Sequence, residues 1–262
     1  MSAPAQNQLG YLLQSLKLPG IRKSYQEMAD LARKESMSHE EYLLAVIQQE
    51  HTIRHQNRTA RLLKESRLPL EKNLDSFDRK RLPLRIDMQL SALLDGSFLK
   101  RAENLLVFGN PGSGKTHLVC ALGHQLVSDG YRVLFKSTHA LVQELLSAKR
   151  DLKLPRFLKQ LGKYQALILD DIGYIQQEQK EMEVLFTLLA DRYERYSIII
   201  TGNLPFSGWE KIFKDPMTTA AAIDRLVHHS IILELNLPSY RLEHAKREKA
   251  AKQSLKKRVL KG

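Results

Sequence analysis

The stretch "NLLVFGNPGSGKTHL", residues 104–118, decides the fold of this chain. An apolar run typical of a buried strand leads into a bend of glycine, proline and serine, and a helical pattern follows. Residues 109–116 match the spacing G-x-x-x-x-G-K-[ST], in the strand-to-helix context that the motif requires. The sequence therefore predicts a phosphate-binding loop. The alternative is a chance match to a glycine turn.

The residue types of this loop explain how it would bind an anion. Glycines let the backbone N–H groups curl around a phosphate, and the N-terminus of the following helix adds a favourable dipole. Lys115 can reach the β- and γ-phosphates, and the Thr116 hydroxyl can ligate Mg²⁺. ATP and Mg²⁺ are thus the predicted cofactors. The predicted binding residues are Gly109, Asn110, Pro111, Gly112, Ser113, Gly114, Lys115, Thr116 and His117.

Strand and helix patterns alternate along the rest of this region. Short apolar runs occur at residues 104–108, 131–135, 166–170, 197–201 and 230–235. Helical stretches begin near Gly114, Thr138, Glu178 and Pro216. Continuous apolar strands separated by helices predict an α/β fold, in which helices cover both faces of a buried parallel sheet.

Polar side chains follow two of these strands. Asp170 and Asp171 end the run "ALILD", and Asn203 comes just after "SIIIT". The carboxyl ends of parallel strands form the ligand-binding edge of such a sheet. We expect Asp170 to hold Mg²⁺ through water, beside the Thr116 hydroxyl, and Asp171 to orient or deprotonate the attacking water. Asn203 could position that water, although asparagine is also common in turns for conformational reasons.

The first 67 residues read as a separate helical domain. Ser38 and Glu41 have the spacing of a capping box at a helix start. Further along the same pattern, Arg54, Arg58 and Arg61 share one helical face, which predicts contacts with nucleic acid or, alternatively, an ordinary solvated face. Residues 68–85 read as a linker because they carry prolines and many charges without periodicity. The α/β domain is then expected over 86–241, followed by a basic tail or helix over 242–262.

Charge and composition narrow the function classes. The net charge of +12 is divided into +4 over residues 1–81, +1 over 82–239 and +7 over 240–262. Basic segments on either side of a neutral centre favour a polyanionic partner, most simply nucleic acid, or else serve solubility. The sequence predicts no membrane span and no signal peptide. A single cysteine, Cys120, fits a reducing cytoplasm and is expected to be a buried apolar side chain.

Taken together, these motifs resemble the AAA+ class of P-loop ATPases over about residues 75–241. Lys115, Asp170 and Asn203 stand where that class has its Walker A, Walker B and sensor 1 residues. The resemblance implies two further residues. Arg225 in "AAAIDRLVHHS" matches the arginine finger that acts on a neighbouring subunit's ATP, and Arg241 in "LPSYR" matches sensor 2.

Within the class, "LDDIGY", "TGNLPFSGW" and "DRLVHHS" resemble the IstB and DnaC/DnaI branch, and the helical N-terminal part resembles IstB itself. This resemblance implies an ATPase that binds duplex DNA, forms homo-oligomers on it through ATP-bridged interfaces, and recruits or stimulates a partner transposase of the IstA type. A helicase loader is the alternative within the same branch, and a P-loop kinase or small-molecule NTPase is the alternative from a different functional class.

The sequence departs from the AAA+ pattern in two places. Asp171 occupies a position that is more often glutamate, and its side chain is one methylene shorter, which favours slow hydrolysis. The resemblance implies that DNA stimulates this hydrolysis. The chain also ends about 22 residues after Arg241, so the usual helical lid is expected to be truncated. The basic tail in its place could track phosphates or be a frayed, solvated terminus.

Overall fold

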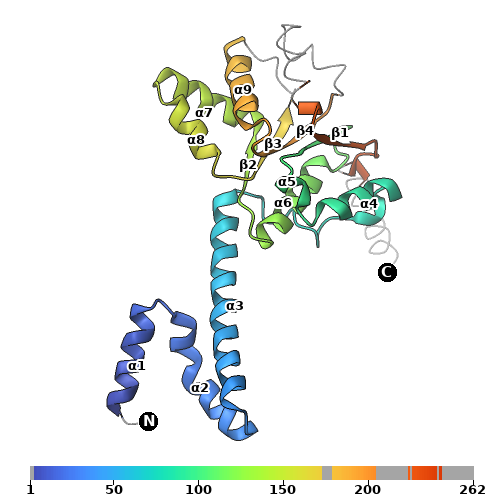
Figure 1. Ribbon diagram of the computed structural model, residues 1–262. Helices are drawn as coiled ribbons and strands as arrows, with labels where there is room; N and C mark the ends of the chain where they lie inside the picture. The colour runs from blue at the N-terminus through green and yellow to red at the C-terminus, as the bar shows by residue number, and fades with distance from the viewer. Residues whose placement is uncertain (1–2, 173–178, 205–223, 225, 241, 244–262) are drawn as a thin grey trace, which may run out of the picture. The chain divides into compact units, whose positions relative to one another are not determined.

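The computed structural model describes residues 3–172, 179–204, 224, 226–240 and 242–243. The chain divides into two compact units, residues 1–61 and 62–262. The first unit consists of α1 (Ala3–Ser15), α2 (Pro19–Glu35) and most of α3 (His39–Ser66), as Figure 1 shows. The division between the units therefore lies within α3, whereas the sequence suggested a boundary within residues 68–85.

Local sequence accounts for the helix starts of this unit. Proline fits the first position of α2 because its missing N–H would have no partner there. At the start of α3 the predicted capping box is present: Ser38 donates its N–H to Glu41 Oε2 at 2.7 Å, and Glu41 donates its N–H to Ser38 Oγ at 3.2 Å. These bonds lower the pKa of the Glu41 carboxyl.

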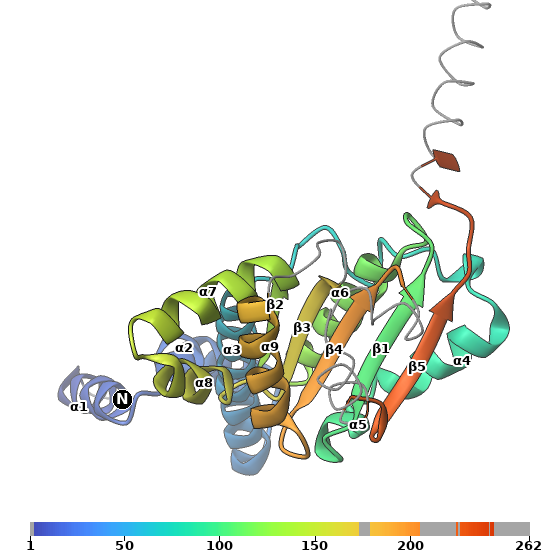
Figure 2. The ribbon, with the colours of Figure 1, turned by 90° about the horizontal axis from the view of Figure 1, so that it is seen from above.

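The second unit is built on a parallel sheet with the strand order β2-β3-β4-β1-β5 (Figure 2). The strands are β1 (Asn104–Gly109), β2 (Val133–Ser137), β3 (Ala166–Ile172), β4 (Ser197–Gly202) and β5 (Ser230–Leu235). The helices are η1 (Arg79–Arg81), α4 (Leu84–Leu93), α5 (Ser97–Lys100), α6 (Lys115–Ser128), α7 (Thr138–Arg150), α8 (Leu154–Leu161) and α9 (Gln179–Arg192). The predicted α/β fold and its five strands are confirmed.

Two buried clusters lie on opposite faces of the sheet. Successive strand residues alternate between them, as Leu105 and Leu106 of β1 show. One cluster packs the sheet against α7, α8 and α9, and the other packs it against α4, α5 and α6. Three predicted helix starts agree with α6, α7 and α9 to within one residue. The helix expected near Pro216 lies outside the described residues, and α8 was not predicted.

Residues 68–85 pack onto this second unit. Leu68 and Leu82 are buried in the cluster that includes α6, and the carbonyl of Pro69 lies 2.9 Å from the Nε2 atom of His124. The prolines and charges that suggested a linker therefore belong to an irregular segment that covers one face of the domain.

No described helix is long and apolar enough to cross a membrane. Residues 244–262 lie outside the described residues. They include most of the expected basic tail, and the expected truncation of the lid concerns the same residues.

Candidate nucleotide site

The loop between β1 and α6 adopts a conformation that depends on its glycines. Gly112 and Gly114 have φ angles of +80° and +99°, in the left-handed region that other residues avoid. At Gly109, a Cβ atom would lie 2.2 Å from the backbone oxygen of Leu235 on β5. The glycine spacing read from the sequence thus reflects two requirements, left-handed turns and a close approach between neighbouring strand ends.

The loop leaves groups that suit an anion. No side chain caps the start of α6, so its first backbone N–H groups form an open helix N-terminus. Lys115 is buried, and its Nζ atom donates to the carbonyls of Gly109 and Asn110 at 2.8 and 2.9 Å. Among the described residues, the buried hydroxyl of Ser113 has no hydrogen-bond partner. These features fit a bound phosphate.

Thr116 and Asp170 come together from different elements. Thr116, in the first turn of α6, donates its hydroxyl to Asp170 Oδ1 at 2.8 Å. Asp170 lies near the C-terminal end of β3, on the same side of the sheet as the phosphate loop, which follows the C-terminal end of β1. A hydroxyl and a carboxylate side by side provide oxygen ligands of the kind that Mg²⁺ takes. The structure therefore brings together the two residues expected to hold the metal.

Asp171 and Asn203 also meet. The Asn203 amide donates from Nδ2 to Asp171 Oδ1 at 3.2 Å, across the ends of β3 and β4. Asp171 is exposed and Asn203 is half-buried, so the pair lies at the surface of the site. The sequence predicted both residues but not their direct contact.

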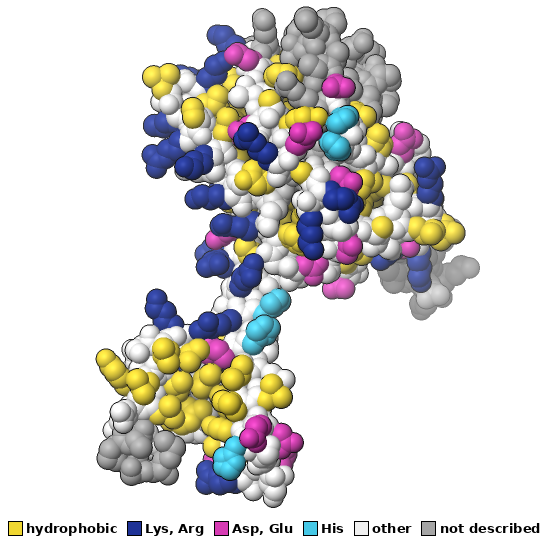
Figure 3. All heavy atoms as spheres, viewed as in Figure 1, with side chains coloured by type: hydrophobic (Ala, Val, Ile, Leu, Met, Phe, Trp, Pro, Cys, Tyr) yellow, Lys and Arg dark blue, Asp and Glu magenta, His cyan; other side chains and the backbone are white. Residues whose placement is uncertain are grey.

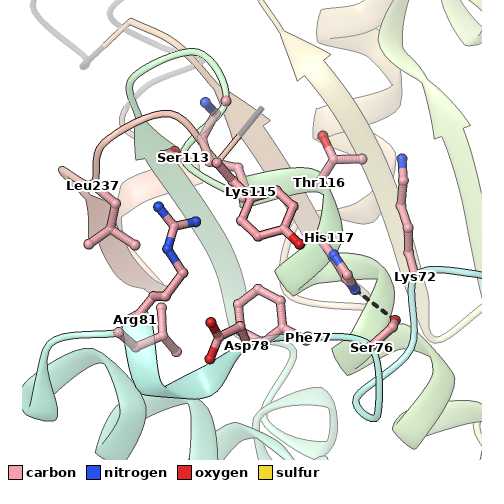
Figure 4. A pocket seen from close by; sticks show the side chains of 14 residues that line it. Lys72, Ser76, Phe77, Asp78, Arg81, Ser113, Lys115, Thr116, His117 and Leu237 are labelled. Atoms are coloured by element: carbon pink, nitrogen blue, oxygen red, sulfur yellow. Dashed lines mark hydrogen bonds between the residues drawn. The ribbon is translucent and has the colours of Figure 1, made fainter. Parts of the chain in front are cut away.

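A cavity of about 200 Å³ opens beside the loop (Figure 4). Its loop side is lined by Gly112 to His117. The opposite side comes from segments that the sequence analysis did not assign to the site: Lys72, Ser76, Phe77, Asp78, Arg81, Leu82, Leu237 and Tyr240. The isolated Phe77 in an otherwise charged segment was the sequence signal that could have suggested a binding wall.

His117 joins the loop to this wall. Its Nε2 atom lies 3.1 Å from Ser76 Oγ and 3.3 Å from the backbone oxygen of Asn73 (Figure 4). Its ring meets that of Phe77 edge-on at 5.1 Å. Burial lowers the pKa of His117. His117, expected among the phosphate-binding residues, thus holds the wall segment against α6.

The segment after β5 closes the cavity from another side. Tyr240 donates its backbone N–H to the Gly112 carbonyl at 2.9 Å, and the Arg81 guanidinium lies over the Tyr240 ring at 5.1 Å. Arg241, the expected sensor 2 residue, follows directly but lies outside the described residues, as does Arg225, the expected arginine finger.

The predicted arginine stripe lies on α3 in the first unit. Arg54, Arg58 and Arg61 are all exposed. Arg54 donates from Nε to Glu50 Oε1 at 2.7 Å and from Nη2 to the Lys17 carbonyl at 2.6 Å. Burial raises the pKa of Glu50, but hydrogen bonds from Arg54 and from the N–H of Ile21 outweigh it, so the pKa is lowered overall. Glu50 therefore partly neutralises the stripe.

The fold and the loop define a P-loop nucleotide-binding protein of the AAA+ class. Residues 11–249 match the sequence model of the family described as IstB-like ATP binding protein, and the chain belongs to that family. It is 43% identical over 238 residues to an insertion sequence ATP-binding protein of Sinorhizobium fredii, covering 90% of this chain and 80% of that protein. It is 39% identical to the IS21 ATP-binding protein of Pseudomonas aeruginosa, covering 92% and 91%.

Solved structures with the same fold include the DnaC helicase loader and DnaI. The DnaC structure has a TM-score of 0.54 and 21% identity, covering 63% of this chain and 97% of that one. The DnaI structure has a TM-score of 0.52 and 20% identity, covering 64% and 94%. At this identity the likeness establishes the fold alone.

Proposed function

We propose that this chain is the DNA-binding helper ATPase of an insertion sequence: it binds ATP with Mg²⁺, assembles on duplex DNA and recruits or stimulates a partner transposase. The observation that carries the ATPase part is the meeting of the Thr116 hydroxyl with the Asp170 carboxylate beside the buried Lys115. The names of its relatives, insertion sequence ATP-binding proteins, support the setting.

Nucleotide binding would use both ends of the cavity. The open N-terminus of α6 and Lys115 would hold the phosphates, while Thr116 and Asp170 would hold Mg²⁺, which would neutralise charge on the phosphates. The base would enter between Phe77, Leu237 and Tyr240, whose apolar and aromatic surfaces line the other end. Phe77 is held at this end of the cavity by its edge-on contact with His117.

Hydrolysis would depend on the acid and amide at the strand ends. Asp171 would orient or deprotonate the attacking water, and Asn203, which already contacts its carboxylate, would help to place that water. Arg241 would contact the γ-phosphate within the same subunit, and Arg225 would complete a neighbour's site. The neighbouring subunit would therefore be required for full activity.

Assembly has support from the first unit. In residues 6–61, the buried apolar side chains are Leu13 and Val46, whereas Tyr11, Leu16, Leu43 and other large apolar side chains are exposed. Figure 3 shows apolar side chains gathered on this unit. Exposed patches of this kind mark interaction sites in other proteins. A homo-oligomer that covers this surface would add to the ATP-bridged interface.

DNA binding is proposed from charge. The exposed Arg54, Arg58 and Arg61 and the basic C-terminal residues would contact phosphates without reading the base sequence. Because the relatives are named as insertion sequence ATP-binding proteins, the helicase-loader alternative is not favoured. Comparing the binding of duplex and single-stranded DNA tests this choice directly, and preference for single strands would support a loader.

ATP binding and turnover are tested with two variants. Lys115→Ala should lose ATP binding or turnover. Asp171→Asn should bind ATP normally but hydrolyse it poorly, and so retain DNA-bound assemblies. A wild-type protein that neither binds ATP nor hydrolyses it with DNA present would refute the proposal. If Asp171→Asn turned over as fast as wild type, the water-orienting role would move to Asn203.

A further inference from the structure

The two acids of the proposed ATPase site lie at an irregularity in the sheet. β3 and β4 pair regularly from Ala166 to Leu169, where Leu169 lies opposite Ile200, and the pairing resumes with Ile172 opposite Gly202. Asp170 and Asp171 together therefore face one residue, Thr201. Two residues opposite one is the arrangement of a β-bulge, a feature common beside active sites because it re-aims side chains.

The backbone of Asp171 confirms the local distortion. Its φ angle is +65°, in the left-handed region. In a regular strand, successive side chains point to opposite faces of the sheet. At this bulge Asp170 instead reaches Thr116 on α6, while Asp171 reaches Asn203 at the end of β4. Both carboxylates are thus directed to partners in the proposed site.

One hydroxyl, that of Thr201, contacts the Asp170 carboxylate and the Asp171 backbone. The side chain is 1% exposed. Its Oγ1 atom donates to Asp170 Oδ1 at 2.6 Å and accepts the backbone N–H of Asp171 at 2.8 Å. The first bond orients a carboxylate, and the second gives an acceptor to the Asp171 backbone N–H, which lies in the bulge.

We propose that Thr201 is a positioning residue that fixes the Asp170–Asp171 pair for hydrolysis; this inference rests on the proposed ATPase function. Asp170 Oδ1 accepts two hydroxyls, from Thr116 and Thr201. If Thr116 were to ligate Mg²⁺, the hydrogen bond from Thr201 would remain to hold the Asp170 carboxylate. The same hydroxyl keeps the Asp171 amide in the bulge, and so keeps its side chain beside Asn203.

The matched variants separate the hydroxyl of Thr201 from its methyl group. Thr201→Val keeps the shape and removes the hydroxyl, whereas Thr201→Ser keeps the hydroxyl. Thr138→Val is the control for loss of a nearby buried hydroxyl, because Thr138 Oγ1 donates to the backbone carbonyl of Asp170 at 3.0 Å and not to its carboxylate. Each variant is purified as the full chain, and its folding is checked by thermal unfolding.

Turnover, metal dependence and amide exchange are then compared. Thr201→Val should lower kcat about 10–100-fold, as loss of an outer partner does at metal sites, and should raise the Mg²⁺ concentration needed for half-maximal turnover. The KM for ATP should stay within about twofold, because the phosphate loop is unchanged. Thr201→Ser should resemble wild type, and Thr138→Val should lose stability with a smaller loss of kcat.

Amide hydrogen exchange at Asp171, followed by NMR, gives a readout that needs no turnover. We expect exchange about tenfold faster in Thr201→Val, because the N–H loses its acceptor, and exchange like wild type in Thr201→Ser. If wild type shows no ATPase activity, the proposed function fails while the exchange data still test whether Thr201 holds the bulge. The positioning role is overturned if Thr201→Val matches wild type in exchange, or in kcat and Mg²⁺ dependence where wild type turns over. It is also overturned if Thr201→Ser is as impaired as Thr201→Val.

Discussion

The contact between the phosphate loop and the segment after β5 can be tested by adding a single methyl group. Gly112 has a φ angle of +80°, and a Cβ built there would lie 2.2 Å from Ser239 Oγ and 3.0 Å from Ser239 Cβ. The Gly112 carbonyl accepts the backbone N–H of Tyr240 at 2.9 Å. Gly112→Ala should therefore both strain the loop and displace the segment that leads to Arg241.

The magnitude follows from these two effects. A left-handed conformation costs an L-residue about 1–2 kcal/mol. Losing the Tyr240–Gly112 hydrogen bond costs about 1 kcal/mol more. The total of about 2–3 kcal/mol corresponds to a loss of about 30–150-fold in an equilibrium constant. Part of this loss should appear as weaker binding of a fluorescent ATP analogue, and part as a lower free energy of unfolding in urea.

Gly114 provides a matched control. Its φ of +99° makes Gly114→Ala comparably strained, but the nearest atom to its Cβ would be Phe77 Cε2 at an ordinary 3.8 Å. Ser239→Gly removes both atoms that oppose Gly112→Ala. We expect it to restore to Gly112→Ala the part of the loss that comes from the displaced Tyr240–Gly112 hydrogen bond, about 1 kcal/mol, because the backbone strain remains. It should restore nothing measurable to Gly114→Ala. Equal rescue of both variants, or rescue of neither, would refute the inference that Ser239 packs directly on the loop.

Four further predictions concern DNA, subunit contact, the acid pair and the buried thiol. Reversing the charge of Arg54, Arg58 and Arg61 should weaken duplex binding and reduce the slope of log K against log salt by about 3, with ATP binding intact; an unchanged salt slope would make the stripe a solvated face. Arg225→Ala should lower DNA-stimulated turnover by about 10³–10⁵-fold. Mixing this variant with Lys115→Ala should recover part of the activity. No recovery, together with normal assembly of Arg225→Ala, would contradict an arginine finger that acts between subunits. Asp171→Glu should reduce both the free energy of unfolding in urea and kcat in steady-state turnover. Faster turnover would show instead that the short aspartate side chain limits the rate of hydrolysis. Burial raises the pKa of Cys120 to about 12, so its thiol should react with a disulfide reagent at pH 8 only after unfolding.

The fold and the centre of the site could be predicted because their signals are local. A buried parallel strand is apolar over its whole length, and the phosphate loop places its glycines at fixed spacing. Asp170 lies near the C-terminal end of such a strand, so its place at the ligand-binding edge follows from topology alone. For the same reason the capping box at Ser38 and Glu41 could be read from the spacing of the two residues.

The outer wall of the cavity could not be predicted in this way. Phe77 and Arg81 lie in a segment without periodicity, and Tyr240 reaches the loop only because β5 is adjacent to β1 in the sheet. Such contacts depend on which distant segments the fold brings together. The ion pair between Glu50 and Arg54 was missed for a different reason, since the two lie one helical turn apart and the spacing was available to read.

The bulge also gives a physical reason for the departure at position 171. Short polar side chains such as aspartate and asparagine tolerate the left-handed region better than longer ones, because they can hydrogen-bond locally. Asp171 has a φ angle of +65° and accepts a hydrogen bond from Asn203 at 3.2 Å. A glutamate with the same backbone would be more strained and would extend one methylene past that amide. Aspartate at this position is therefore suited to the bulge that Thr201 holds. A protein with glutamate at this position is expected to have a different backbone conformation there.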